Sequence, residues 1–242
     1  MFEPDSTPTA GNYPAAVVWD LDGTLVESAP DLATALNTVL EAHGQSTHGV
    51  DAVRLMIGGG VPKLIERGFR AANAPLGDAE IQAIVPEFMD IYSACATNNT
   101  YLVDHAREAL EHLHQSGVTQ GLCTNKPISV TRKILAALNI GHYFDSVIGG
   151  DSTACRKPDP LPLLTCIENL AASPAGTVMV GDSGAAVGAA RAAGVKIIIV
   201  PDGYTGVPAA ELGADHIVDD LRGVPARLRE VHGLSLIHIS EP

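Results

Sequence analysis

The 242-residue chain is poor in aromatic and basic side chains. Aromatic residues make up 4% of it, and Lys plus Arg number 15 against 28 Asp plus Glu, which gives a formal net charge of −13. This balance argues against a basic surface that would bind nucleic acid or an anionic membrane. If such an acidic protein acts on an anionic ligand, a metal ion or a locally placed cation must offset the repulsion between like charges.

Cysteines and long apolar runs are also scarce. Cys95, Cys123, Cys155 and Cys166 form no Cys-x-x-Cys pair, so we expect reduced thiols and no disulfide framework. No apolar run approaches the ~18 residues of a membrane span, and the first residues do not resemble a secretion signal. We therefore expect a cytoplasmic protein, a monomer or homodimer, with no nucleic-acid or membrane partner.

One stretch near the N-terminus combines a buried strand with two carboxylates. Residues 15–19 are an unbroken Val-rich apolar run, and Asp20, Asp22 and the turn-forming Gly23 follow it. The two Asp side chains point to the same side of an extended backbone, at the strand end where open α/β sheets bind ligands. A surface turn capped by Asp is the alternative. An EF-hand is excluded, because its loop requires Gly where Leu25 stands.

The rest of the chain predicts an α/β fold with a helical insertion. Residues 1–13 read as a loose arm, and Ser28 is a possible N-cap for the first helix. Helical spacing continues to about residue 98, and strands then alternate with helices, which predicts a doubly wound parallel sheet. Predicted helices span 28–43, 50–56, 61–72, 78–97, 105–115, 128–138, 161–170, 185–193 and 219–231. Predicted strands after the insertion span 118–123, 146–149, 177–180 and 196–200, while 234–242 fits no element and is interpreted as a non-native tail.

Three later segments also place polar residues near predicted strand ends. Thr124 and Asn125 follow one strand, Lys157 lies in a Pro-rich loop, and Asp182 follows another strand. A hydroxyl with backbone N–H groups at a helix N-terminus can hold a phosphate, although for each segment alone an ordinary cap or a solvated loop is the better interpretation. Their convergence on one edge of one sheet favours a site.

These segments resemble a known family. Asp-Leu-Asp-Gly-Thr at 20–24, Thr-Asn-Lys at 124–126, Lys-Pro at 157–158 and Gly-Asp-Ser at 181–183 resemble the motifs of the haloacid-dehalogenase superfamily of phosphatases. Within it, residues 14–231 resemble the bacterial phosphoglycolate phosphatases. The resemblance implies a Rossmann-like α/β core at 14–27 and 99–233, with a helical cap domain at 28–98.

The resemblance also implies a mechanism on a small phosphorylated metabolite. Asp20 would be the nucleophile that forms an aspartyl-phosphate, and Asp22 would be the general acid and then the general base. Lys157 would neutralise charge between Asp20 and the phosphate. The expected reaction is hydrolysis of 2-phosphoglycolate to glycolate.

Further implied roles concern phosphate and metal binding. Thr124 and Asn125 would bind the phosphoryl oxygens. Mg²⁺ would be held by Asp182, by the Asp20 carboxylate and by the backbone carbonyl of Asp22, a set that suits its preference for oxygen.

A glycine-rich segment in the predicted cap is a candidate for substrate binding. The N–H groups of Gly58, Gly59 and Gly60 could meet the substrate carboxylate, and Lys63 and Arg67 could add charge. A flexible connection between helices is the alternative. The segment is not a Walker loop, because Gly-Lys-Ser/Thr is absent.

One position departs from the family pattern. The fourth motif usually ends in a second acid, and Ala186 stands in its place. This departure leaves open a homologue that binds phosphates with weak turnover. A sugar phosphomutase of the same superfamily, which shares the core, is a second alternative to a phosphatase. A hydrolytic dehalogenase is disfavoured, because those relatives lack the second Asp and this chain has Asp22.

Overall fold

The first strand, β1 (Ala16–Trp19), forms the centre of a parallel sheet. The computed structural model describes residues 13–239, with side chains described up to residue 233. Six strands lie in the order β5-β4-β1-β6-β7-β8, and every pairing is parallel. The remaining strands of this sheet are β4 (Thr119–Cys123), β5 (Ser146–Ile148), β6 (Thr177–Gly181), β7 (Lys196–Ile199) and β8 (His216–Ile217).

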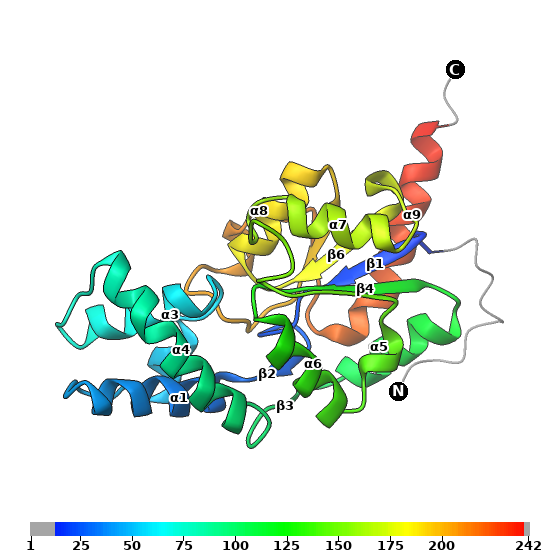
Figure 1. The fold of residues 1–242 in the computed structure, drawn as a ribbon. Helices are drawn as coiled ribbons and strands as arrows, with labels where there is room; N and C mark the ends of the chain where they lie inside the picture. Colours follow the sequence, from blue (N-terminus) through cyan, green and yellow to red (C-terminus); the bar gives the residue numbers. More distant parts are fainter. Residues whose placement is uncertain (1–12, 240–242) are drawn as a thin grey trace.

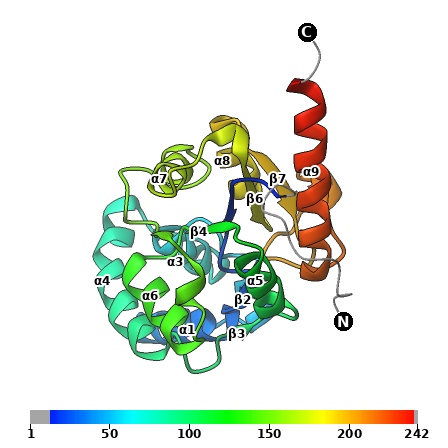
Figure 2. The same ribbon diagram turned by 90° about the vertical axis from the view of Figure 1, so that its right-hand side faces the viewer.

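Helices cover both faces of the sheet, because the apolar side chains of its inner strands alternate between two cores. Val17 and Trp19 face one core, while Ala16 and Val18 face the other. Helices α7 (Leu161–Asn169) and α8 (Gly184–Ala193) contribute to the second core. Helices α5 (Ala106–Gln115), α6 (Ile128–Ala137) and α9 (Val224–Ile239) contribute to the first, and Figure 2 shows the two groups on opposite sides. Short 3-10 turns occupy Gly141–Tyr143, Pro174–Gly176, Ala209–Glu211 and Leu221–Gly223.

A helical lobe is inserted after β1 (Figure 1). It contains α1 (Ala29–Ala42), α2 (Val50–Arg54), α3 (Val61–Ala71) and α4 (Asp78–Cys95). The chain enters the lobe through β2 (Val26–Glu27) and leaves it through β3 (Tyr101–Leu102), which pair in antiparallel orientation. The two connections therefore lie side by side, at the end of the sheet where β1 stops.

Asp31 joins these two connections. Its carboxylate, at the start of α1, accepts hydrogen bonds from the backbone N–H groups of Asn99 and Thr100 and from the Thr100 hydroxyl, all between 2.9 and 3.0 Å. The side chain is fully buried, so these donors compensate for the loss of water around the charge. Asp31 thereby holds the segment that leaves the lobe, before β3, against the start of α1, where the chain enters the lobe.

The predicted α/β class with a doubly wound parallel sheet is confirmed. The predicted helices and strands are present, with ends shifted by up to two residues except in the last helix. Strands β2, β3 and β8 were not predicted, because two residues are too few to show an alternating pattern. All four cysteines are free, as expected.

Two expectations at the ends of elements were wrong. The last helix begins at Val224 after a 3-10 turn, and it continues to Ile239, so residues 234–239 do belong to an element. Tyr13 is not part of a loose arm, because it is only 4% exposed and packs in the first core; residues 1–12 and 240–242 lie outside the described residues. Ser28 is the N-cap residue of α1, as expected, although its side chain makes no capping hydrogen bond.

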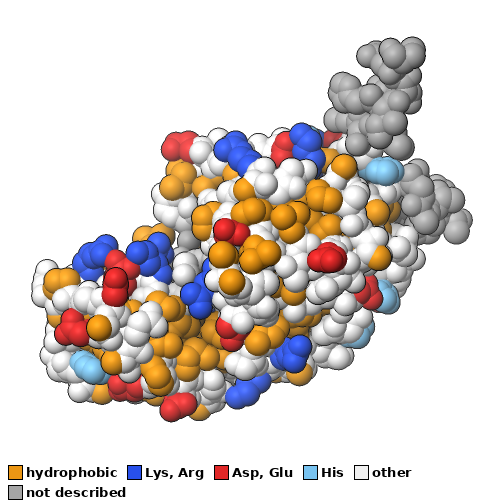
Figure 3. Space-filling model, turned by 45° about the horizontal axis from the view of Figure 1, so that its top comes forward, with side chains coloured by type: hydrophobic (Ala, Val, Ile, Leu, Met, Phe, Trp, Pro, Cys, Tyr) orange, Lys and Arg blue, Asp and Glu red, His pale blue; other side chains and the backbone are white. Residues whose placement is uncertain are grey.

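Two surface features bear on the expected partners. On the face shown in Figure 3, acidic and basic side chains are interspersed and form no basic stripe. Among the described helices, none combines the length and apolarity needed to cross a bilayer.

Candidate active site

The strand order brings the predicted site residues to one edge of the sheet. Because β1 lies between β4 and β6, the residues that follow these three strands are neighbours: Asp20, Thr124 and Asp182. One pocket between the sheet edge and the helical lobe is lined by these residues together with Asp22, Asn125, Lys157, Gly58 and Gly60. Gly59 does not line it.

Asp20 lies against the predicted lysine. The Lys157 ammonium is 2.6 Å from Asp20 Oδ2 and also donates a hydrogen bond to the backbone carbonyl of Cys123 (2.7 Å). The backbone N–H of Leu21 donates to Asp20 Oδ1 (2.8 Å). Lys157 lies in the loop after β5. Its side chain is 1% exposed, so the surrounding residues restrict it to a position beside Asp20.

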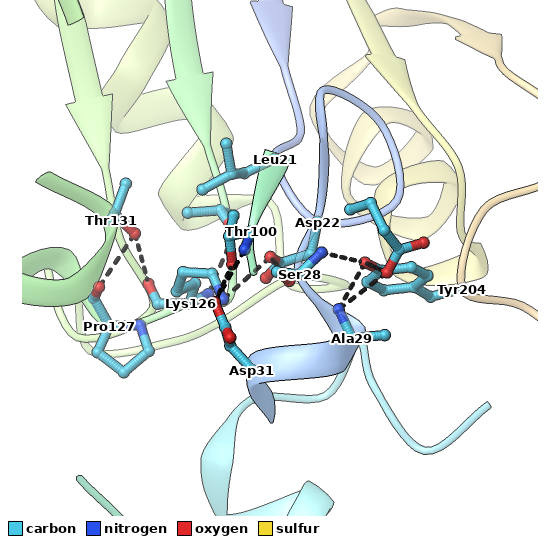
Figure 4. Close-up of polar contacts among 12 residues, drawn as sticks. Leu21, Asp22, Ser28, Ala29, Asp31, Thr100, Lys126, Pro127, Thr131 and Tyr204 are labelled. Atoms are coloured by element: carbon cyan, nitrogen blue, oxygen red, sulfur yellow. Dashed lines mark hydrogen bonds and ion pairs between the residues drawn. The ribbon is translucent and has the colours of Figure 1, made fainter. Parts of the chain in front are cut away.

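Asp22 is held from two sides through a single oxygen. The Ser28 hydroxyl donates to Asp22 Oδ1 over 2.5 Å, and the Lys126 ammonium lies 3.0 Å from the same atom (Figure 4). Ser28 therefore orients a carboxylate of the site instead of capping α1. Within the described residues, Asp22 Oδ2 has no hydrogen-bond partner and remains available to a ligand.

Asp182 is the most deeply buried carboxylate of the three. Its Oδ2 accepts a hydrogen bond from the backbone N–H of Tyr204 (2.7 Å), and Thr24 lies at hydrogen-bond distance from Oδ1 (3.4 Å). Burial, and then the negative charge of Asp20, raise the pKa of Asp182 to about 7. A side chain at Gly23 would overlap the Asp182 carboxylate, which accounts for glycine at this turn, where φ is also +76°.

Asn125 connects the lobe to the loop that carries Lys157. Its amide nitrogen donates to the carbonyls of Gly58 and Lys157, and its amide oxygen accepts from the Lys157 N–H, each over 2.9 Å. These contacts use both donors of the side-chain amide, so its side chain is not free for phosphate. The Asn125 backbone N–H has no partner among the described residues and remains available.

The glycine segment contacts the pocket only in part. Gly58 and Gly60 line it, with φ values of +110° and +83° that side chains rarely adopt. The two cations proposed to accompany them lie outside it: Lys63 is half exposed and pairs with Glu66, and Arg67 donates to the carbonyls of Met56 and Ile57.

Sequence reasoning missed three residues that shape the site. Lys126 is buried beside Asp22, and its ammonium also donates to the Tyr92 hydroxyl of α4 over 2.5 Å. Tyr204, after β7, binds Asp182 through its backbone and the start of α1 through its hydroxyl. Lys126 could have been suspected, since it directly follows Thr124 and Asn125. Nothing local in the sequence indicated Tyr92 or Tyr204.

The neighbouring thiol does not provide a competing nucleophile. Cys123 directly precedes Thr124, but burial raises its pKa to about 12. A cysteine reacts as the thiolate, so this side chain stays in its unreactive thiol form near neutral pH.

The chemistry of the carboxylates fits a magnesium ion. Asp20 and Asp182 are close enough for their charges to oppose each other, and a cation between them would relieve this repulsion. In the described part of the chain, no three His, Cys, Asp or Glu side chains form a metal-binding group, and Mg²⁺ commonly uses only one or two carboxylates with water and phosphate oxygens. Ala186 is fully buried in the core between α8 and the sheet, so it supplies no ligand.

Comparisons with known proteins identify the family of this chain. A family model described as haloacid dehalogenase-like hydrolase matches residues 17–200. A phosphoglycolate phosphatase of Caulobacter vibrioides is 37% identical over 211 residues, which cover 87% of this chain and 89% of the relative. One from Cereibacter sphaeroides (strain ATCC 17029) is 40% identical over 197 residues, covering 81% and 89%.

Solved structures show the same fold. The crystal structure of a predicted phosphoglycolate phosphatase from Haemophilus somnus 129pt superposes with a TM-score of 0.82 at 30% identity, covering 89% of this chain and 98% of the other. CbbY from Rhodobacter sphaeroides, in complex with phosphate, superposes with a TM-score of 0.70 at 24% identity, covering 89% and 99%. This chain belongs to the haloacid dehalogenase-like hydrolase family and is an enzyme of its phosphatase type.

Proposed function

We propose that this enzyme is a Mg²⁺-dependent phosphomonoester hydrolase that acts through an aspartyl-phosphate, with 2-phosphoglycolate as its substrate. The observation that carries the proposal is the placement of Asp20 at the end of β1, paired with Lys157 and close enough to Asp182 for the two carboxylates to interact. A carboxylate nucleophile needs a neighbouring cation to approach an anionic phosphate, and Lys157 lies 2.6 Å from it.

The proposed reaction has two steps. The Asp20 carboxylate attacks phosphorus, the bond between phosphorus and the ester oxygen breaks, and Asp22 gives a proton to the departing alkoxide. Asp22 then takes a proton from water, whose oxygen attacks the phosphorus of the aspartyl-phosphate; the bond between phosphorus and the Asp20 oxygen breaks, which releases inorganic phosphate and regenerates the Asp20 carboxylate. Because the contacts of Asp22 with Ser28 and Lys126 are made through Oδ1, Oδ2 is available for this role.

The remaining site residues bind the phosphate. The Thr124 hydroxyl and the free Asn125 N–H are the proposed donors to its oxygens, and Lys157 balances charge on the Asp20 side. Asp20, Asp182 and the Asp22 carbonyl would hold Mg²⁺, which supplies charge neutralisation at the phosphate oxygens when bound.

Substrate choice is assigned to the helical lobe. We propose that residues 28–98 form a cap domain on a core made of 14–27 and 99–233. The cap side of the pocket is mostly apolar, with Ile57, Val61 and Leu64, and it includes Gly58 and Gly60. Such walls leave little polar surface for a sugar and suit a small ester, in line with the phosphatase names of the relatives.

A panel of phosphate esters tests the proposal. The purified protein should release inorganic phosphate from 2-phosphoglycolate faster than from sugar phosphates, and only with Mg²⁺. Conversion of a sugar phosphate to its isomer without phosphate release would instead identify a phosphomutase. Absence of phosphate release from every ester at saturating Mg²⁺ would identify a phosphate-binding homologue without turnover.

A further inference from the structure

The described residues that line the pocket include two ammonium groups with different surroundings. Lys157 is held on the Asp20 side by the Cys123 carbonyl and by Asp20 itself. Lys126 lies on the other side, between Asp22 of the core and Tyr92 of the lobe. The first cation suits a phosphate bound at Asp20, and the second has so far been given only the role of holding Asp22 Oδ1.

Lys126 is costly to bury, which calls for an explanation beyond packing. Its side chain is 2% exposed, and a buried ammonium is tolerated only when it is paired and hydrogen-bonded. Asp22 Oδ1 and the Tyr92 hydroxyl occupy two of its three N–H donors. Among the described residues no third acceptor contacts it, although the residue lines the pocket.

Tyr92 fixes the position of this ammonium. Nζ lies 4.8 Å from the centre of the Tyr92 ring, and burial raises the pKa of the Tyr92 hydroxyl well above its ordinary value. The hydroxyl therefore stays protonated and offers its oxygen to Lys126 without adding a charge. A ligand anion that enters the pocket meets an ammonium already held in place, with one donor unused.

The charges around the pocket make a cation necessary beside any anionic group of the substrate. The pocket lining carries three carboxylates, on Asp20, Asp22 and Asp182, against the two lysines. The substrate carboxylate must therefore be held close to an ammonium group that offsets the repulsion from these side chains. Lys63 and Arg67 cannot provide it, since neither lines the pocket.

We propose that Lys126, positioned by Tyr92, binds the carboxylate of the substrate and sets the preference for carboxylate-bearing phosphate esters. This inference rests on the proposed function, because it assumes a phosphate at Asp20 and a carboxylate on the leaving group. It replaces the glycine segment as the main determinant of selectivity. In this proposal Gly58 and Gly60 form part of the pocket wall, and Lys126 supplies the positive charge that binds the carboxylate.

The test compares two esters that differ only in the carboxylate. In ethyl phosphate a methyl group replaces the carboxylate of 2-phosphoglycolate, so the ratio of their kcat/KM values measures carboxylate recognition. In Lys126→Met this ratio should fall about 10- to 100-fold, mainly through KM for 2-phosphoglycolate, as expected for a lost hydrogen bond between charged groups. Lys133→Met removes the same charge from an exposed position of α6 and should leave the ratio unchanged.

An unchanged ratio in Lys126→Met would overturn the proposal, because it would show that the lysine acts only on Asp22 or on folding. Lys126→Arg keeps the charge and should retain part of the preference, which guards against misfolding of the Met variant. Tyr92→Phe should lower the ratio less than Lys126→Met, because it keeps the ring and removes only the hydroxyl.

Glycolate inhibition separates this proposal from the proposed substrate. If the wild-type enzyme does not prefer 2-phosphoglycolate over ethyl phosphate, the substrate assignment is wrong. Competitive inhibition of ethyl phosphate hydrolysis by glycolate, weakened at least tenfold in Lys126→Met, would still establish Lys126 as a carboxylate site. Equal inhibition of both proteins, or none of the wild type, would exclude it.

Discussion

The backbone N–H of Tyr204 donates a 2.7 Å hydrogen bond to Asp182 Oδ2. The hydroxyl of the same tyrosine accepts from the N–H groups of Ser28 and Ala29, at the start of α1, and donates to Glu27 (Figure 4). One residue of the loop after β7 thus connects a carboxylate of the candidate metal site with the entrance to the helical lobe. Tyr204 thereby couples the position of α1 to the position of the Asp182 carboxylate.

We expect Tyr204→Phe to lower the free energy of unfolding by about 1–3 kcal/mol, since it leaves the buried N–H of Ser28 without its acceptor, while the Ala29 N–H keeps Glu27. Urea unfolding measures the loss. Tyr101→Phe is the matched control, because Tyr101 is 56% exposed and should change stability little. Equal stability of both variants would show that water replaces the Tyr204 hydroxyl.

Asp20→Asn should abolish phosphate release without unfolding the protein. The change removes a nucleophile at a strand end and preserves the size of the side chain. Phosphate release and circular dichroism are the measurements, and Asp51→Asn, at a side chain that is 96% exposed, is the control. Turnover near the wild-type rate in Asp20→Asn would remove Asp20 from its proposed role.

Asp182 should make the metal-free protein less stable as pH rises. Its pKa is raised to about 7 in the folded state, so between about pH 4 and 7 the folded protein holds a proton that the unfolded chain releases. The contribution of Asp182 to the free energy of unfolding is therefore fully present below about pH 4. It decreases as the pH rises from about 4 to 7, by at most about 1.4 kcal/mol per pH unit.

The measurement is urea unfolding with a chelator at pH 5 and pH 8. The wild type should lose more stability between these values than Asp182→Asn, whose side chain does not titrate. Mg²⁺ at pH 8 should restore stability to the wild type more than to the variant. Parallel pH profiles for the two proteins would contradict the assignment.

Ala186→Asp should lower the Mg²⁺ concentration needed for half-maximal activity. A carboxylate near a metal site can orient its bound water, and losing such a partner typically costs about 10–100-fold in metal affinity or activity. Because Ala186 is fully buried, the added charge should also lower the melting temperature of the metal-free form. A Mg²⁺ titration and metal-free melting test both effects. An unchanged Mg²⁺ midpoint would show that position 186 does not support the metal.

The sequence by itself determined the sheet and the residues at its edge. The Val-rich run before Asp20 can be buried on both faces only in a covered sheet, and strand–helix alternation then dictates parallel order. Since parallel strands point the same way, residues after neighbouring strands must meet. Asp20, Thr124 and Asp182 were therefore predictable as a group, as was the helical insertion after the first strand.

The tertiary structure decided which partners those residues have. Ser28 looked like a helix cap from its local sequence, but folding places its hydroxyl 2.5 Å from Asp22, a partner in the preceding turn. Asn125 lies in the motif predicted to bind phosphate, yet its amide joins Gly58 to Lys157 across gaps of 67 and 32 residues. Tyr204 reaches Asp182 and α1 only because β7 lies beside β6. Hydrogen bonds form between groups that packing brings within about 3 Å, and sequence spacing carries no information on such distances between separate elements.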